Sequence, residues 1–215
     1  MSGIEQLRPG MIGFGPTGGW GGPPIWLAEI MLRENFEVGD VIAEHVFVVT
    51  EVAPWSPGAS SVWAVEAMPE GARKVMINDR WTKRFAYVMP PEDYPGQAVD
   101  AAAIARAMIG TPYSFASYAA LAAWRFGWKT PRLERWIDRR KPGRSTVPGQ
   151  SPEGMRRHIT VPLPVEAICS VLADQAWALT GKQVMPAGTP HQCVTPGALA
   201  KALLEMPGAQ WLWPE

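Results

Sequence analysis

The sequence predicts a single α+β domain, with most of its strands in the first half of the chain and most of its helices in the second. Runs rich in β-branched residues, bounded by Gly and Pro, indicate strands, and apolar residues at helical spacing indicate helices. A chain of 215 residues can form one good hydrophobic core, and we find no internal repeat or domain boundary, so one domain is expected over 1–215. The expected strands are 11–14, 41–50, 62–67, 73–77 and 84–89, and the expected helices 25–33, 98–109, 116–126, 131–139, 168–177 and 198–204.

The expected sheet is antiparallel and meandering. The β-branched segment 41–50 should be its central strand, with His45 inside it. Residues 54–61 should connect this strand to 62–67 as a hairpin, and the next two strands should extend the sheet. An internal carboxylate is costly in an alternating strand unless it is paired, so we expect a partner for Glu66.

Cys169 lies near the start of an expected helix. Ile168, Leu172 and Ala176 fall at helical spacing after the Pro162-Leu163-Pro164 segment. Backbone N–H groups in a first helical turn have no intrahelical acceptor, and together with the helix dipole they favour an anion such as a thiolate. Taken alone, however, such a cysteine is more often a small buried core residue.

Cys169, His45 and Glu66 together supply the groups that a nucleophilic thiol enzyme needs. These are a thiolate, an imidazole that takes and returns a proton, and a third polar group that orients the imidazole. If strands 41–50 and 62–67 are neighbours, His45 and Glu66 can hydrogen-bond side by side. The other two histidines, His158 and His191, lie in loop-like, polar contexts and are expected at the surface.

Composition excludes several other classes. Twenty basic and twenty acidic residues give no net charge, so nothing indicates a nucleic-acid partner. The glycine-rich segment 15–24 lacks the Gly-Lys-Ser/Thr ending of a phosphate-binding loop and the spacing of a dinucleotide fingerprint. His191 and Cys193 could donate to a metal, but metal-ligand spacings are missing, so neither a metal nor another cofactor is expected. Two free thiols are favoured, and an oxidised Cys169–Cys193 pair stays open.

The chain shows no targeting or membrane segment. Its N-terminus lacks the basic-then-apolar order of a secretory signal, and no run of about 18 apolar residues is present, so stable membrane insertion is not expected. Localisation and oligomeric state stay open. Eleven tryptophans predict either a heavy core or an aromatic-lined groove. A basic, Pro-rich segment at about 129–158 is expected to be an irregular surface insertion, with a lid as the alternative.

Six short segments share a family's order of motifs. They are residues 7–12 (LRPGMI), 44–49 (EHVFVV), 62–68 (VWAVEAM), 110–113 (GTPY), 168–172 (ICSVL) and 194–199 (VTPGAL). In this order they resemble the permuted papain-like amidases, the YaeF/YiiX-like branch of a superfamily that includes bacterial cell-wall cysteine peptidases and, more distantly, lecithin:retinol acyltransferase. The chain departs from the family pattern at Met11 and Ser114, where aspartate is usual or frequent.

The resemblance implies a circularly permuted papain-like fold, in which a small antiparallel sheet packs against the helix that carries the nucleophile, with the active-site cleft between them. Cys169 would attack an acyl carbon, His45 would act as base and then as acid, and Glu66 would hold the imidazole. Tyr113 would line the cleft, with a buried aromatic at a turn as the alternative, and Trp20 and Trp26 would form a substrate wall.

The leading functional hypothesis is therefore a cysteine hydrolase that cleaves an amide bond in a small peptide, a cell-wall-like molecule or a lipid amide. A lipid-directed acyltransferase or thioesterase with the same triad is the second hypothesis, because helix 116–126 is apolar enough to touch a lipid surface. A catalytically silent structural or virion protein is the third.

Overall fold

The structure is a computed structural model that covers the main predicted sheet and three of the predicted helices. It describes residues 3–16, 37–38, 41–56, 59–77, 84–93, 96–113, 143–150, 156–163, 167–187, 189 and 194–213. The predicted helices 25–33, 116–126 and 131–139 lie outside these described residues.

Six described strands form one antiparallel sheet in the order β10-β7-β1-β4-β5-β6. Their bounds are Ile12–Gly15 for β1, His45–Ser56 for β4, Ala59–Met68 for β5, Gly71–Ile77 for β6, Ala86–Met89 for β7 and Gln210–Leu212 for β10. The fold is therefore a mixed α and β structure built on an antiparallel sheet, as the sequence predicts.

The predicted meander is right for three strands and wrong for the fourth. β4, β5 and β6 follow one another across the sheet, but β7 pairs with β1 on the other side of β4. Ile12 of β1 lies opposite Val48 of β4 on one side and opposite Val88 of β7 on the other. All four residues of β1 are buried, and a buried strand needs a hydrogen-bonding neighbour on each side. The apolar pattern of a strand does not say which strands will be its neighbours.

The predicted central strand also begins differently from the expectation. It divides into β3 (Val41–Ile42), which pairs with β2 (Glu37–Val38), and the long strand β4. His45 is the first residue of β4 and so lies at the strand's end rather than inside it. Most of the predicted connection 54–61 is strand, because β4 continues to Ser56 and β5 begins at Ala59, with register shifts between Val49 and Glu51 and between Pro54 and Ser56.

The sequence pattern gave no sign of β10. Its three residues, Gln210-Trp211-Leu212, are too few to show alternation, yet they pair with β7. The ring of Trp211 stacks on Phe14 at 6.0 Å and on Trp213 at 5.0 Å between centroids. Aromatic packing of this kind stabilises a short edge strand that backbone pairing alone would hold weakly.

Three described helices match the expected ones: α3 (Gln97–Ala107), α6 (Cys169–Ala178) and α7 (Pro196–Leu204). The positive φ angles of Gly110 (86°) and Gly181 (94°) end the first two, as predicted. α7 has the predicted start, because the Thr195 hydroxyl accepts the Ala198 N–H at 3.1 Å and proline follows at the first helical position. No helix in the described part of the chain is long and apolar enough to cross a membrane.

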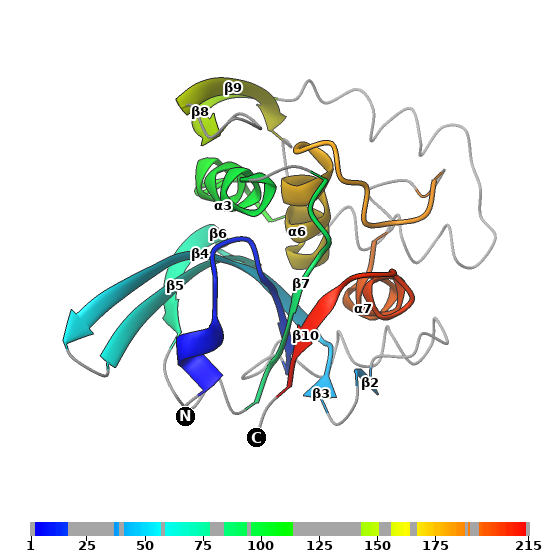
Figure 1. Cartoon of the computed structure of the whole chain (residues 1–215). Helices are drawn as coiled ribbons and strands as arrows, with labels where there is room; N and C mark the ends of the chain where they lie inside the picture. Colours follow the sequence, from blue (N-terminus) through cyan, green and yellow to red (C-terminus); the bar gives the residue numbers. More distant parts are fainter. Residues whose placement is uncertain are drawn as a thin grey trace.

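Part of the predicted irregular insertion is a regular hairpin. β8 (Gly143–Gln150) pairs with β9 (Arg156–Leu163) in an antiparallel ribbon. Figure 1 shows this ribbon, in yellow-green, on the side of α3 that faces away from the main sheet. α3 is therefore covered on two sides, which explains why most of it is buried although its sequence predicts an amphipathic helix. His158 is exposed on this ribbon, as expected.

Two hydrophobic clusters lie against the main sheet. The larger one joins Phe14, Val46 and Val48 to the helices, including Leu172 and Trp177 of α6. The second gathers apolar side chains that alternate with these along the strands: Leu7, Met11, Phe47, Val49, Val62, Ala64, Ile77, Phe85 and Tyr87. Figure 1 shows α3 and α6 side by side above the sheet, and both helices pack against β4.

Candidate active site

The register of β4 and β5 brings His45 to Glu66. Phe47 lies directly opposite Glu66, and His45 is two residues earlier on the same face of its strand. The Nε2 atom of His45 is 2.7 Å from Oε2 of Glu66, and both residues are buried. His45 is therefore the partner that the sequence analysis predicted for the buried carboxylate of Glu66.

A third side chain, Arg73, holds the other carboxylate oxygen. Its Nε and Nη2 atoms lie 2.9 Å and 2.8 Å from Oε1 of Glu66. Sequence reasoning treated Arg73 only as the start of a strand. The missing signal was the turn: a two-residue connection at 69–70 sets Met68 opposite Gly71, and therefore Glu66 opposite Arg73.

Cys169 is the first residue of α6, and its side chain is hydrogen-bonded to His45. Because Glu66 engages Nε2, Nδ1 is the ring nitrogen left for the thiol. Ile168 precedes the helix and makes no side-chain capping hydrogen bond to the N–H groups of this first turn. The structure thus brings all three predicted catalytic residues together, with Cys169 only 2% exposed.

The electrostatics of the cluster favour a protonated imidazole. Burial lowers the pKa of His45, but hydrogen bonds to Cys169 and Glu66 and the negative charge of these groups outweigh it and raise the pKa from 6.5 to about 9. Burial likewise raises the pKa of Glu66, and the hydrogen bonds and positive charges of His45 and Arg73 outweigh it, holding the pKa of this carboxyl below its ordinary value. The arrangement is suited to an imidazolium held between the sulfur of Cys169 and the carboxylate of Glu66.

Backbone and hydroxyl contacts fix the start of α6. The Ser170 hydroxyl donates to the Val194 carbonyl at 2.6 Å, which ties the first turn of α6 to the segment before α7. The N–H of Ala167 donates to the Pro112 carbonyl at 3.0 Å. Tyr113, which the resemblance places in the cleft, forms a parallel bridge with Ala167, and Ala167 lies two residues before Cys169 in the chain.

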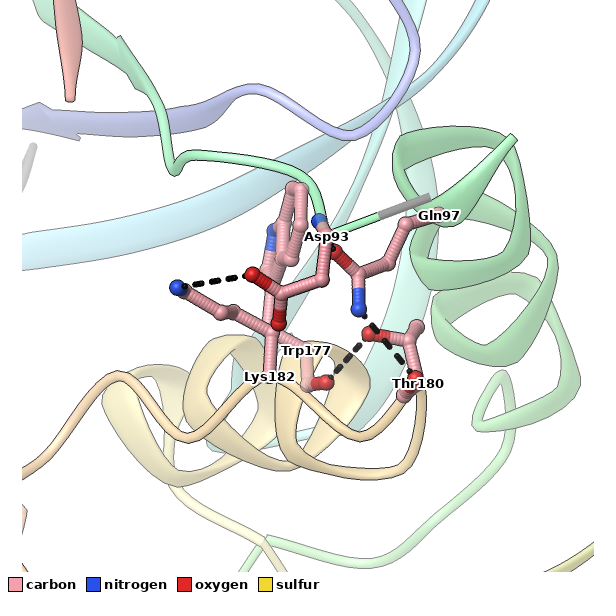
Figure 2. Close-up of polar contacts among 5 residues, drawn as sticks. All are labelled: Asp93, Gln97, Trp177, Thr180 and Lys182. Atoms are coloured by element: carbon pink, nitrogen blue, oxygen red, sulfur yellow. Dashed lines mark hydrogen bonds and ion pairs between the residues drawn. The ribbon is translucent and has the colours of Figure 1, made fainter. Parts of the chain in front are cut away.

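A polar network that runs from buried Thr180 and Gln97 to the exposed Asp93–Lys182 pair fixes the other end of α6 (Figure 2). The Thr180 hydroxyl donates to the Trp177 carbonyl at 2.7 Å, and the Thr180 carbonyl accepts from Gln97 Nε2 at 3.2 Å, which ties the helix to the start of α3. Gln97 Oε1 in turn accepts the Asp93 N–H at 2.9 Å, and Lys182 approaches Asp93 Oδ1 at 3.4 Å. The helix that carries Cys169 is thus anchored at both ends.

The remaining predicted site residues are not among those that the structure describes. Trp20 and Trp26, predicted as a substrate wall, lie outside the described residues, as do His191 and Cys193. Among the residues that the structure describes, no group of three or more His, Cys, Asp or Glu side chains is arranged to hold a metal ion.

The raised pKa of His45 makes stability depend on pH. The pKa is 6.5 for the ordinary side chain and about 9 in the folded chain, so the stabilisation from protonated His45 is fully present below about pH 6.5 and is lost as the pH rises through about 9. We therefore expect the difference in free energy of unfolding between the wild type and His45→Gln to shrink by about 3 kcal/mol at most over this range. Urea denaturation at a series of pH values measures it, with His158→Gln as the exposed control. A difference that stays constant with pH would contradict the predicted coupling.

No known family model, curated protein or solved structure matches this chain.

Proposed function

We propose that the chain is a cysteine-dependent hydrolase that cleaves amide bonds through an acyl-enzyme at Cys169. The observation that carries this proposal is the buried, hydrogen-bonded row Cys169–His45–Glu66 at the start of a helix. An imidazole between a thiol and a carboxylate is the arrangement that activates a thiol for acyl transfer. Such a row is costly to bury unless its members pair with one another.

The first half of the reaction uses the thiolate and the imidazolium. Sγ of Cys169 attacks the carbonyl carbon of the amide, and the carbonyl electrons move to oxygen. N–H groups at the start of α6 would stabilise this oxyanion. As the C–N bond breaks, the imidazolium of His45 gives its proton to the leaving nitrogen, which departs as an amine and leaves a thioester on Cys169.

The second half consumes one water molecule. His45, now neutral, takes a proton from water as the water oxygen attacks the thioester carbon. The C–S bond breaks, the acid product leaves, and the thiolate and imidazolium are restored. Glu66 stays ionised throughout and keeps Nε2 of His45 oriented.

We further propose that the fold is a circularly permuted papain-like fold. The support is the antiparallel sheet whose strand β4 supplies the histidine, together with the helix α6 that packs on it and supplies the cysteine. In this chain the histidine strand precedes the cysteine helix, which is the permuted order that the motif resemblance implies.

One observation favours a catalytically silent protein instead. Cys169 is 2% exposed, and a buried thiol is usually inert. The lipid-directed hypothesis relied on helix 116–126, which lies outside the described residues. The two alternatives predict different results, because a silent thiol is not alkylated quickly, whereas an acyltransferase prefers an alcohol or amine acceptor to water.

The pH dependence of Cys169 alkylation by iodoacetamide tests the proposal. Every variant also carries Cys193→Ser, so that Cys169 is the only thiol that can be alkylated. We expect fast alkylation well below the free-thiol pKa of about 8.5, and a large fall in rate at pH 6 to 7 in His45→Ala, because removal of the imidazolium leaves the thiolate without its counter-ion. His158→Ala is the matched control, since this histidine is exposed on the distant hairpin.

Turnover completes the test. Release of amine from small peptide amides and cell-wall fragments should require Cys169, so Cys169→Ala should abolish it, and added alcohols should not compete with water. Slow alkylation that rises only near the free-thiol pKa and is indifferent to His45 would overturn the proposal in favour of a silent protein. Preferential acyl transfer to an alcohol rather than to water would contradict the proposed hydrolase and indicate an acyltransferase.

A further inference from the structure

Arg73 and His45 divide one carboxylate between them. Across the adjacent strands β4, β5 and β6, His45 takes Oε2 of Glu66, while Nε and Nη2 of Arg73 both take Oε1. Glu66 and Arg73 are direct cross-strand partners, so the backbone register fixes this geometry. The side chain of Glu66 is 2% exposed and that of Arg73 is 50% exposed, so Arg73 reaches the buried carboxylate from the solvent side.

A shared carboxylate binds each cation less strongly than an unshared one. The two cations are of like charge and lie on the two oxygens of one group, so each disfavours the other. Arginine is always charged, whereas His45 can release its proton, and the cost of this repulsion therefore falls on the imidazolium.

We propose that Arg73 is a positioning residue that acts through Glu66: it fixes Oε2 toward His45 and weakens the hold of the carboxylate on the imidazole proton. This inference rests on the proposed function for its chemical meaning. An imidazolium must give its proton to the leaving amine, and a general acid works best when its pKa lies near the operating pH. Without Arg73, a histidine paired with an unshared buried carboxylate would be a poorer acid.

Among the described residues, titratable side chains approach His45 from α6 and β5. Cys169 faces His45 from α6, and Glu66 faces it from β5. Glu44, which precedes His45, is buried and makes interactions of its own. Lys74 follows Arg73 on β6 but points to the opposite face of its strand, where it pairs with Glu51 at 2.7 Å. Arg73 is therefore the cation of β6 that acts on this carboxylate.

The test is the titration midpoint of the His45 ring, followed by NMR of its nitrogen-coupled ring protons. The chain has three histidines, and the His45 signals are assigned by their loss in His45→Gln. In Arg73→Gln we expect the midpoint to rise by about half a unit to one unit, because a nearby positive charge is removed while Glu66 stays ionised. Arg73→Lys keeps the charge and should stay near the wild type.

Two further variants make the result specific. Lys74→Gln removes the same charge from the next residue of the same strand and should leave the midpoint unchanged. Glu66→Gln should lower the midpoint, opposite to Arg73→Gln. If Arg73→Gln does not fold, Arg73→Met offers the same loss of charge with a side chain of similar length.

A midpoint that is unchanged or lowered in the neutral Arg73 variants would overturn the inference. The measurement needs no substrate, so it is separable from the proposed function: an inert Cys169 would refute the hydrolase and still leave the midpoint shift to be seen. If the enzyme is active, its turnover falls at alkaline pH as His45 loses its proton, and in the neutral Arg73 variants this fall should move to higher pH together with the His45 midpoint. A fall that stays at the same pH while the midpoint moves would also contradict the role assigned to Arg73.

Discussion

Replacing Glu66 with glutamine is expected to lower turnover of an amide substrate by about 100- to 10,000-fold, the range seen when the orienting carboxylate of a triad is neutralised. Glutamine keeps the size of the side chain but not its charge. The hydrogen bond and the negative charge of Glu66 both raise the pKa of His45, so their loss lowers this pKa and makes the imidazolium form less favourable. Fewer molecules hold the thiolate–imidazolium pair, and the amide side chain can also select the wrong imidazole tautomer.

The measurement is kcat/KM against pH for the wild type and Glu66→Gln. Glu51→Gln is the matched control, because Glu51 is a carboxylate of β4 that pairs with exposed Lys74 at 2.7 Å and lies outside the row. We expect the control to stay within about twofold of the wild type, since exposed ion pairs contribute little. A Glu66→Gln enzyme of near wild-type activity would show that His45 does not depend on the carboxylate.

The three candidate catalytic residues could be found from sequence because each breaks a local pattern. In the sequence, Glu66 is a carboxylate inside an apolar strand segment, His45 is an imidazole inside another, and Cys169 stands near the start of an apolar helix. Each is costly or unusual alone, and pairing removes the cost. The structure brings the three together, although the local pattern said only that partners must exist.

Arg73 could not be found in the same way. An arginine in an edge strand fits a solvent-exposed position and breaks no rule, so only the register of the hairpin reveals it. That register depends on the two-residue turn at 69–70, a detail that the predicted strand 73–77 missed by starting two residues late. Element boundaries therefore decided whether this residue could be recognised.

Local sequence patterns could not predict the order of the strands in the sheet or the hairpin β8–β9. That β7 pairs with β1 is a long-range result of packing, and nothing in either segment specifies the other. In the hairpin, Arg, Pro and Gly residues conceal a strand pattern that becomes favourable once the ribbon covers α3. An isolated two-stranded ribbon is marginal in water, so its stability comes from that contact rather than from its own sequence.

Trp177→Ala is expected to lower the free energy of unfolding by about 3–5 kcal/mol, the usual cost of removing a large aromatic side chain from a core. Trp177 is fully buried in α6, and its indole N–H donates to the Gly10 carbonyl at 2.9 Å, which ties the helix to the turn before β1. Trp177→Phe keeps most of the apolar contact and loses this donor, so we expect a smaller loss of about 1–3 kcal/mol. Urea denaturation measures both, with exposed Trp213→Ala as a control expected within about 1 kcal/mol of the wild type.

The same variants separate the stability of the fold from the chemistry of the site. Trp177 lies eight residues along α6 from Cys169, about 12 Å at the helical rise. The start of the helix has its own supports in the Ser170–Val194 and Ala167–Pro112 hydrogen bonds. Trp177→Phe should therefore change the alkylation rate of Cys169 by less than about twofold, far less than His45→Ala. If Trp177→Phe slowed alkylation as much as His45→Ala does, the hydrogen bond between Trp177 and Gly10 would determine the position of the Cys169 thiol.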